Sequence, residues 1–417
     1  MLKKTSAILL IAMLAASMTA CASNAKSASS SASESSGKTS SQTTSASNTS
    51  TSGTERFTDR DLQQEADTTD AESLTLSDGK DLTISKAGVY VITGSASDAS
   101  IIVDAADDDK VQLVLNNVTL TNADAPAIYV KNADKVFVTT QSGSQNSLSV
   151  TSTFTADGET NTDAVIFSKD DLVLNGEGTL AITSTDNGIS GKDDIKITGG
   201  TITIESASDA IEANESISIA DGAVTIDSQK DGIHAENNDD DTVGDVYISG
   251  GTLNITAASD GIQGTTLAQI DGGTIDITAS EGIEATTVII NDGTINISAS
   301  DDGINASAKS SAADVLVEIN GGNLTIKMGQ GDTDGIDSNG DLIINGGTID
   351  ITGQSTCDYD GKAEKNGGTL IINGEETDTI PNQMMGGHGG MDGGMNGDMN
   401  GGMGGGQMPQ DGNFRGM

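Results

Sequence analysis

Short runs in which aliphatic and polar residues alternate fill the middle of the chain. In GTITIE and GTIDIT, which begin at Gly200 and Gly273, isoleucine alternates with Thr, Glu or Asp. A period of two is typical of a β-strand that buries one face. Two further short aliphatic pairs follow in each unit, which ends in Gly-Gly or Asp-Gly, where positive φ is easily reached. The pattern therefore predicts three short strands and three turns per unit.

The unit recurs with a basal period near 22 residues, marked by an acidic or amide residue before Gly or Ala. The marker positions are Asn187, Asp209, Asp231, Asp260, Glu281, Asp302 and Asp334, at intervals of 22, 22, 29, 21, 21 and 32 residues. The longer intervals contain insertions at 236–244, 307–314 and 329–333. Such a repeat predicts an all-β solenoid, a parallel β-helix with stacked aliphatic residues inside. Leucine-rich repeats have a similar period, but their LxxLxL spacing and helical segment are missing.

Composition divides the chain into five segments. Ser and Thr dominate the segment before the repeat, and Gly and Met dominate the last one, so neither can bury enough apolar surface to fold. The predicted segments are a signal peptide at 1–20, a disordered stalk at 21–54, an N-terminal β cap with the first irregular coils at 55–160, the regular coils at 161–374, and a disordered tail at 375–417.

The first residues predict export. Lys3 and Lys4 precede an apolar run, and small residues lead to Cys21 in MTAC, which resembles a bacterial lipobox. We therefore expect lipidation of Cys21 and a protein anchored at the outer face of the bacterial cell membrane, touching the membrane only through this lipid. Cys357 is the one other cysteine, so no internal disulfide is possible once Cys21 is acylated. We expect a monomer.

The net charge of the chain limits the classes of ligand that it can bind. The chain has 62 acidic and 20 basic residues and a net charge of −42, which disfavours nucleic acid and anionic lipid as direct ligands. With 5 Phe, 4 Tyr and no Trp, the core must be built from small aliphatic residues. Cations are the natural partners of such a chain.

Acidic residues form columns if the coils stack in register. The unit x-Asp-Gly-Ile-x-Ala places one carboxylate before Gly and a second polar group three residues later. Stacked coils bring such groups within about 5 Å of one another, and nothing in the sequence supplies compensating Lys or Arg. Ca²⁺ suits the columns because it accepts six to eight oxygens in tolerant geometry. The candidate ligands are Asp209, Glu212, Asp231, Asp260, Glu281, Glu284, Asp301, Asp302, Asn305, Asp334 and Asp337.

Two alternatives weaken parts of this assignment. Asp is also favoured in turns by its own hydrogen bonding, so the column could be solvated and metal-free. His234, which occupies the second position of one unit, is better explained as a spacer or a hydrogen-bonding residue than as a ligand.

Several segments resemble a known family. AGVYVITG, KVQLVLNNVTL, APAIYV, the DGI units and the Gly/Met-rich tail are similar to those of exported bacterial carbohydrate-binding β-helix proteins, whose fold is like that of pectate lyases. The resemblance covers about 72–374 plus the tail. It implies a right-handed β-helix, bound calcium, and binding of cellulose-like or acidic polysaccharide. The DDGIN segment resembles the Asp-Asp-x-x-Asp calcium cluster of some pectate lyases, but Asn305 stands in the last place.

These observations lead to a calcium-dependent, surface-anchored module that binds polysaccharide. An acidic polymer would be bridged to the protein by Ca²⁺, whereas the lack of Trp leaves few aromatic platforms for a neutral glucan. The alternative is a polyuronate lyase in which a lysine removes a proton acidified by Ca²⁺, with Lys230 as the best candidate and Lys192 as the second.

A structural role in adhesion or ice binding is a third possibility. Threonines at 201, 252, 274, 294 and 348 would form a column. The residues two positions further along (Thr203, Asn254, Asp276, Asn296 and Asp350) break the flat threonine array that ice recognition requires. High β propensity explains these threonines more simply.

Overall fold

The computed structural model describes residues 56–330 and 333–383, and every helix or strand in these ranges is a β-strand. No helix among these residues could cross a bilayer. The predicted signal peptide, Cys21, the stalk at 21–54 and residues 384–417 of the predicted tail lie outside the described residues.

The strands form a 24-stranded and a 12-stranded sheet. Pairing between named strands is parallel, except that β36 (Glu375–Thr377) pairs antiparallel with β35 (Thr369–Ile372). Consecutive strands do not pair along most of the chain. Each pairs instead with the strand three further on, as β14 (Thr201–Ser206) does with β17 (Ala223–Ser228). The prediction of an all-β protein with parallel strands is confirmed.

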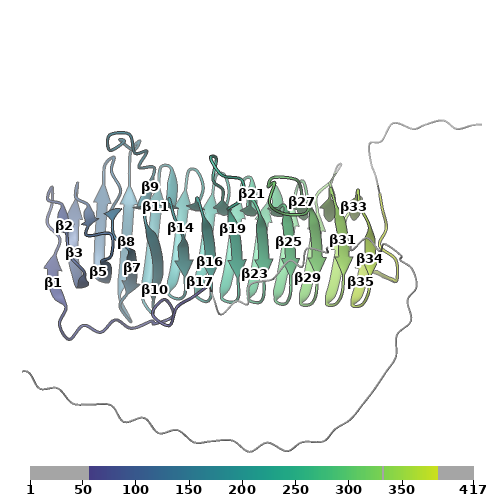
Figure 1. Cartoon of the computed structure of the whole chain (residues 1–417), viewed down its shortest axis with the longest axis horizontal. Helices are drawn as coiled ribbons and strands as arrows, with labels where there is room; N and C mark the ends of the chain where they lie inside the picture. The colour runs from purple at the N-terminus through teal and green to yellow at the C-terminus, as the bar shows by residue number, and fades with distance from the viewer. Residues whose placement is uncertain (1–55, 331–332, 384–417) are drawn as a thin grey trace, which may run out of the picture. The chain divides into compact units, whose positions relative to one another are not determined.

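This pairing arranges the strands in three rows, in which neighbours follow chain order (Figure 1). The first row contains β8 (Gln145–Val150), β11 (Thr179–Ser184), β14, β17, β20 (Thr252–Ala257), β23 (Thr274–Ala279), β26 (Thr294–Ala299), β29 (Asn323–Met328), β32 (Thr348–Thr352) and β35.

The second row is the 12-stranded sheet. It contains β2 (Leu82–Ile84), β4 (Ile101–Asp104), β6 (Ile128–Asn132), β9 (Ala164–Ser168), β12 (Asn187–Gly191), β15 (Ile211–Ala213), β18 (Ile233–Ala235), β21 (Asp260–Gly264), β24 (Glu281–Ala285), β27 (Ile304–Ala306), β30 (Ile336–Ser338) and β33 (Cys357–Tyr359).

The third row lies in the same sheet as the first. It contains β7 (Lys135–Thr140), β10 (Asp171–Gly176), β13 (Ile195–Ile197), β16 (Ser216–Ile219), β19 (Asp245–Ile248), β22 (Leu267–Ile270), β25 (Thr287–Ile290), β28 (Leu316–Ile319), β31 (Asp341–Ile344) and β34 (Ala363–Lys365). The long strand β5 (Lys110–Asn122) joins the two rows by pairing with both β7 and β8, and β1 (Glu72–Thr75) and β3 (Gly88–Ser97) precede it.

Stacked aliphatic side chains form the core. From β12 to β33 of the second row the register aligns one interior position of each strand, and all of these side chains are buried. They are Ile189, Ile211, Ile233, Ile262, Ile283, Ile304, Ile336 and Cys357. Each residue packs between its counterparts above and below, so small aliphatic residues fill the interior without large rings.

Glycines before the first-row strands allow the chain to turn. Gly251 and Gly273 have φ of 89° and 101°, in the region that side chains with a Cβ rarely adopt. A Cβ on Gly273 would also lie 3.1 Å from the Gly251 carbonyl oxygen. The stacked turns therefore require glycine twice over, for conformation and for space.

Residues 56–64 form a strap that packs against the third row. They do not belong to an N-terminal cap, so the predicted start of the cap at residue 55 is corrected. Arg56 pairs with Asp245 of β19 at 3.2 Å, and the Arg60 guanidinium lies 4.4 Å from the centre of the Phe137 ring in β7. The strap thus crosses from β19 to β7. The prediction missed it because these contacts join residues more than 70 positions apart.

The predicted disordered tail begins too early. Residues 375–377 form β36, and the Gln383 backbone N–H donates to the Cys357 carbonyl oxygen at 2.9 Å. Low hydrophobicity suggested disorder here, but backbone pairing with β35 orders the segment. Residues 72–150 pair in parallel as the later strands do.

Candidate acidic metal site

The register brings the predicted acidic positions into two stacked columns beside the second row. The turn column contains Asn187, Asp209, Asp231, Asp260, Glu281, Asp302 and Asp334. The strand column contains Glu212, His234, Gln263, Glu284, Asn305 and Asp337, whose backbones pair directly. The columns follow from the x-Asp-Gly-Ile-x-Ala unit because each unit adds one strand to the same row.

Backbone hydrogen bonds satisfy much of the turn column. The N–H of Asp231 donates to Asp209 Oδ1 at 2.9 Å, and the N–H of Asp260 donates to Asp231 Oδ1 at 2.9 Å. Asn187 and Asp302 accept in the same way from the next residue of the column. This part of the column is therefore a ladder of turns joined by backbone-to-side-chain hydrogen bonds. In the described chain, no such bond joins Asp260 to Glu281.

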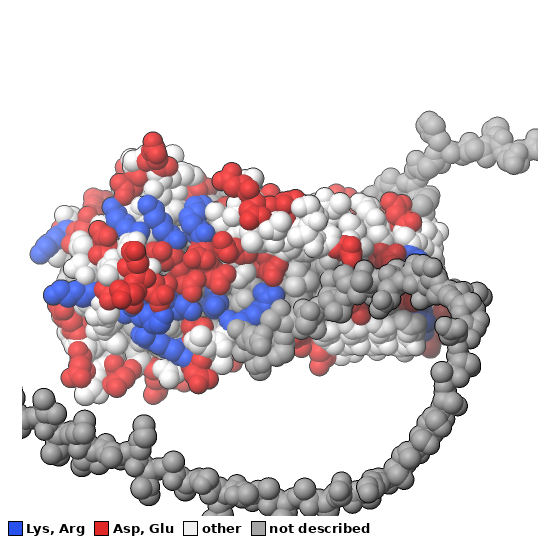
Figure 2. All heavy atoms as spheres, viewed as in Figure 1, with Lys and Arg blue, Asp and Glu red and all other residues white. Residues whose placement is uncertain are grey.

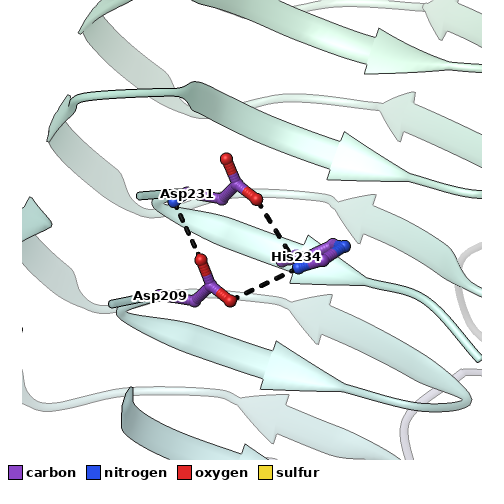
Figure 3. Close-up of side chains that lie close together, drawn as sticks. All are labelled: Asp209, Asp231 and His234. Carbon is purple, nitrogen blue, oxygen red and sulfur yellow. Dashed lines mark hydrogen bonds and ion pairs between the residues drawn. The ribbon is translucent and has the colours of Figure 1, made fainter. Parts of the chain in front are cut away.

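His234 neutralises the first part of the columns (Figure 3). Its Nδ1 lies 3.5 Å from Asp209 Oδ2 and from Asp231 Oδ2, and its Nε2 lies 2.9 Å from Glu236 Oε2. Burial lowers the pKa of His234, but hydrogen bonding of its ring to the accepting Asp209 carboxylate and the charges of Asp231, Asp209 and Glu236 outweigh this effect and raise the pKa to about 9. A protonated imidazole at pH 7 supplies the positive charge that a metal would otherwise bring.

Asp260, Glu281 and Glu284 form a second group in which no histidine takes part. Their candidate ligand oxygens all lie within 4.8 Å of one another. Asp260 and Glu284 are buried, at 7% and 8% exposure. Burial first, and then the charges of Asp231, Glu281 and Glu284, raise the pKa of Asp260 to about 8, while burial raises that of Glu281 to about 7. Binding of a proton or of a cation would therefore reduce the electrostatic repulsion within the group.

Amide groups complete this site. Asn305 Nδ2 donates to Glu281 Oε2 at 3.0 Å, and Asn305 Oδ1 is buried without a hydrogen-bond partner among the described residues. Gln263, with its amide oriented to satisfy its neighbours, donates to Asp260 Oδ2 at 3.1 Å. Both amides therefore face the carboxylates with their N–H groups, and the carboxylate oxygens are the ligands that match the chemistry of Ca²⁺.

Lys309 contradicts the prediction that no basic residue compensates the column. Its Nζ lies 2.7 Å from Glu284 Oε2 and 3.0 Å from the Gln263 amide oxygen. Lys309 lies in the insertion at 307–314, outside the repeat, so its position could not be read from the repeat pattern.

Two insertions meet beside this group. The Ser311 backbone N–H and hydroxyl both donate to Asp241, at 3.1 and 3.0 Å. Asp241 belongs to the insertion after β18, and Ser311 to the insertion after β27. Strands β21 and β24, which supply Asp260, Glu281 and Glu284, lie between these two strands in the row. The insertions therefore flank the strands that hold the acidic group.

The other predicted ligands are more dispersed. Glu212 accepts hydrogen bonds from the Asn187 amide at 2.8 Å and the Ser190 hydroxyl at 3.2 Å. Burial raises the pKa of Asp302 to about 7 and that of Asp337 to about 6. Among the described residues, Asp301, Asp302, Asp334 and Asp337 do not form a group of three close carboxylates. The DDGIN segment is thus split, since the Asn305 amide turns toward Glu281.

Neither of the two predicted lysines forms an ion pair with the acidic group among the described residues. Lys230 is exposed in the turn before Asp231. Lys192 Nζ lies 5.6 Å from the centre of the Phe167 ring. Among the described residues, Lys309 is the lysine paired with Glu284.

Sequence reasoning also missed a second acidic region, at the turns between the second and third rows. Asp170, Asp171, Asp193, Asp194 and Glu215 lie there, and burial together with their mutual repulsion raises the pKa of Asp193 and Glu215. A band of acidic side chains bordered by Lys and Arg is visible in Figure 2. The signal was the recurring Asp-Asp before the third-row strands, as in KDDLVL and KDDIKI.

The repeat region matches a family model for carbohydrate-binding domain-containing proteins over residues 78–330 and 279–409. These ranges cover more than half of the chain. The chain belongs to this family.

Two further proteins have measured similarity to this chain. A carbohydrate-binding domain-containing protein of Acetivibrio thermocellus is 33% identical over 124 residues, which are 29% of this chain and 43% of the relative. The match therefore spans less than half of the relative's length. A gadolinium derivative of a polysaccharide lyase-like protein from C. thermocellum aligns with a TM-score of 0.34 and 23% identity, over 72% of this chain and 96% of that one.

Proposed function

We propose that this member of the carbohydrate-binding family binds polysaccharide in a calcium-dependent manner, and that Asp260, Glu281 and Glu284 hold the ion. The observation behind the proposal is the close approach of three carboxylates, two of them buried, within 4.8 Å. Desolvated like charges at this distance repel strongly, and a divalent cation relieves the repulsion.

The available oxygens support calcium over a smaller ion. Three carboxylates leave several positions for water or for ligand oxygens, as the irregular shell of Ca²⁺ allows. Lys309 now pairs with Glu284, so the ion either displaces the ammonium group or uses the remaining oxygens.

An acidic polysaccharide is the ligand that this site would explain best. A polyuronate is repelled by a chain of net charge −42, unless a metal ion bridges the carboxylates of protein and sugar. A cellulosic polymer is the other ligand class consistent with the sequence, and it would not require the ion.

The proposal includes the architecture and the location. Pairing of each strand with the third strand further on, in register over many repeats, is what a parallel β-helix requires, and we propose that the coil is right-handed. We further propose export, lipidation at Cys21 and attachment at the outer face of the bacterial membrane, on the basis of the MTAC segment.

The test compares a site variant with a matched control. We expect Asp260→Asn/Glu281→Gln, or a calcium chelator, to weaken retention on polygalacturonate at least tenfold. Asp221→Asn/Asp227→Asn removes the same charge from exposed positions and should retain binding. Retention that is indifferent to both the chelator and the site variant contradicts the proposal.

A lyase remains the second candidate because of Lys309. If the ion displaces Lys309 from Glu284 and the ammonium group loses its proton, the resulting amine would be placed to take a proton from a uronate. Neither Lys230 nor Lys192 pairs with this acidic group among the described residues. Incubation with polyuronate and Ca²⁺ would then raise the ultraviolet absorbance of an unsaturated product, and Lys309→Gln would abolish the rise. A flat trace with the wild-type protein leaves binding without catalysis.

A further inference from the structure

The outward face of the first row presents columns of small polar side chains. The register aligns Glu205 and Asp227 with Thr256, Thr278, Ser298 and Lys327 in one such column. A neighbouring column aligns Thr225 with Asn254, Asp276, Asn296 and Thr325. The inward residues between them are buried aliphatics that form the core, so the outward side chains take no part in core packing.

A shallow groove of about 290 Å³ runs over this face at β17, β20, β23 and β26. Its polar lining includes Asn254, Thr256, Asp276, Thr278, Asn296 and Ser298. The outward side chains are short here, whereas the same column has the longer Glu205 before the groove and Lys327 after it. The hollow is therefore produced by side-chain length at successive repeats.

The groove differs chemically from the acidic columns. Hydroxyl and amide groups dominate it, and Asp276 is the one charged residue in its lining. The Asn296 amide donates to Asp276 Oδ1 at 2.7 Å, and this hydrogen bond partly offsets the negative charge of the carboxylate. With no Lys or Arg to attract an anion and no cluster of carboxylates to hold a metal, the groove suits an uncharged ligand with many hydroxyl groups.

We propose that this groove is a second carbohydrate site, which binds a neutral glycan chain laid along the first row without calcium. The proposal rests on the proposed function only in that the ligand is a carbohydrate. Successive strands repeat the same donors and acceptors at about 4.8 Å, so a chain of sugar units meets an equivalent set of groups at each strand. The other rows fit less well, because the second is acidic and the strap covers part of the third.

The lack of aromatic platforms shapes the expected affinity. A hydrogen bond that replaces one to water gains little, so a single sugar unit should bind weakly. Several units held by one chain add their contributions, and affinity should rise steeply with oligosaccharide length until the groove is filled.

The experiment measures binding of cello-oligosaccharides of increasing length by titration calorimetry in the presence of a calcium chelator. We expect length-dependent binding that Asn254→Ala/Asn296→Ala weakens about tenfold. The control variant Asn323→Ala/Gln145→Ala removes amides from exposed positions of the same row outside the groove and should bind within twofold of wild type. Thermal melting of each variant checks that the fold is retained.

Three outcomes overturn the inference: no binding of the neutral oligosaccharides, equal binding by the groove variant and the wild type, or binding that requires Ca²⁺. Retention on polygalacturonate with Ca²⁺ is measured in parallel with the same variants. Since the groove variant keeps Asp260, Glu281 and Glu284, failure at the groove and failure at the metal site give different results.

Discussion

At the scale of single residues, buried carboxylates are neutralised in two different ways. His234 lies between Asp209 and Asp231 and titrates with a pKa of about 9, so it supplies a positive charge from within the column. Lys309 approaches Glu284 from an insertion and leaves Asp260 and Glu281 without a basic partner in the described chain. Because of this difference we propose the second group, and not the first, as the cation site.

Asp163 is a carboxylate that no histidine or lysine neutralises through an ion pair among the described residues, and its pKa shows the energetic consequence. Burial, and then the charge of Glu212, raise its pKa to about 6, and its Oδ1 is buried without a hydrogen-bond partner among the described residues. The folded state therefore binds the proton more tightly than the unfolded state. Asp163 reduces stability at high pH, and this loss disappears as the pH falls through about 6 toward 4.

Asp163→Asn should accordingly stabilise the protein at pH 8 by roughly 1–2 kcal/mol, with the partial exposure of the side chain already discounted. Asn keeps an acceptor for the Asn161 amide, which donates to Asp163 at 2.6 Å. Urea unfolding with chelator at pH 8 and pH 4.5 measures the difference, which should fall to roughly a third at the lower pH. The exposed Asp227→Asn serves as control, and an equal gain at both pH values would refute the mechanism.

The sequence predicted which residues share a column but not how each is satisfied. The spacing of Asp-Gly units determines stacking, because one unit adds one strand to a row. Partners such as Lys309 come from insertions whose path is set by tertiary contacts, for instance the bonds from its backbone N–H and that of Ser310 to Thr286 Oγ1. No periodicity encodes such contacts.

At the scale of strands, stacked isoleucines stabilise the second row. Ile283 is fully buried between Ile262 and Ile304 in the register. Truncation to Ala should cost about 2–5 kcal/mol, because it removes buried apolar area and leaves a cavity between two aligned side chains. Thr183→Ala, at an exposed position of β11, should change the free energy of unfolding by less than about 0.5 kcal/mol.

Chemical unfolding of both variants tests this prediction. A cost for Ile283→Ala no larger than that for Thr183→Ala would mean that the stacked column does not hold the row together. Strands with clear alternation were predictable for the same reason that this variant is costly, since the buried positions recur with a period of two. The strap and β36 were not, because their sequences are polar and their order comes from contacts with distant strands.

At the scale of the whole molecule, metal binding should be linked to stability. An ion that binds the folded state alone adds RT ln(1 + [L]/Kd), about 2.7 kcal/mol at a hundredfold excess over Kd. We expect Ca²⁺ to raise the thermal midpoint, and Asp260→Asn/Glu281→Gln to remove most of the increase. Differential scanning calorimetry with and without chelator measures it; an unchanged midpoint for the wild-type protein would contradict calcium binding at this site.

The strap has a mechanical consequence. The described chain begins beside β19, crosses to β7, and only then reaches the first strand of the sheets. A pull on the segment before residue 56 thus loads Arg56 and its neighbours before it reaches any paired strand. These side-chain contacts would therefore break first. The freed strap would lengthen the chain under load, while the backbone hydrogen bonds between paired strands stay intact.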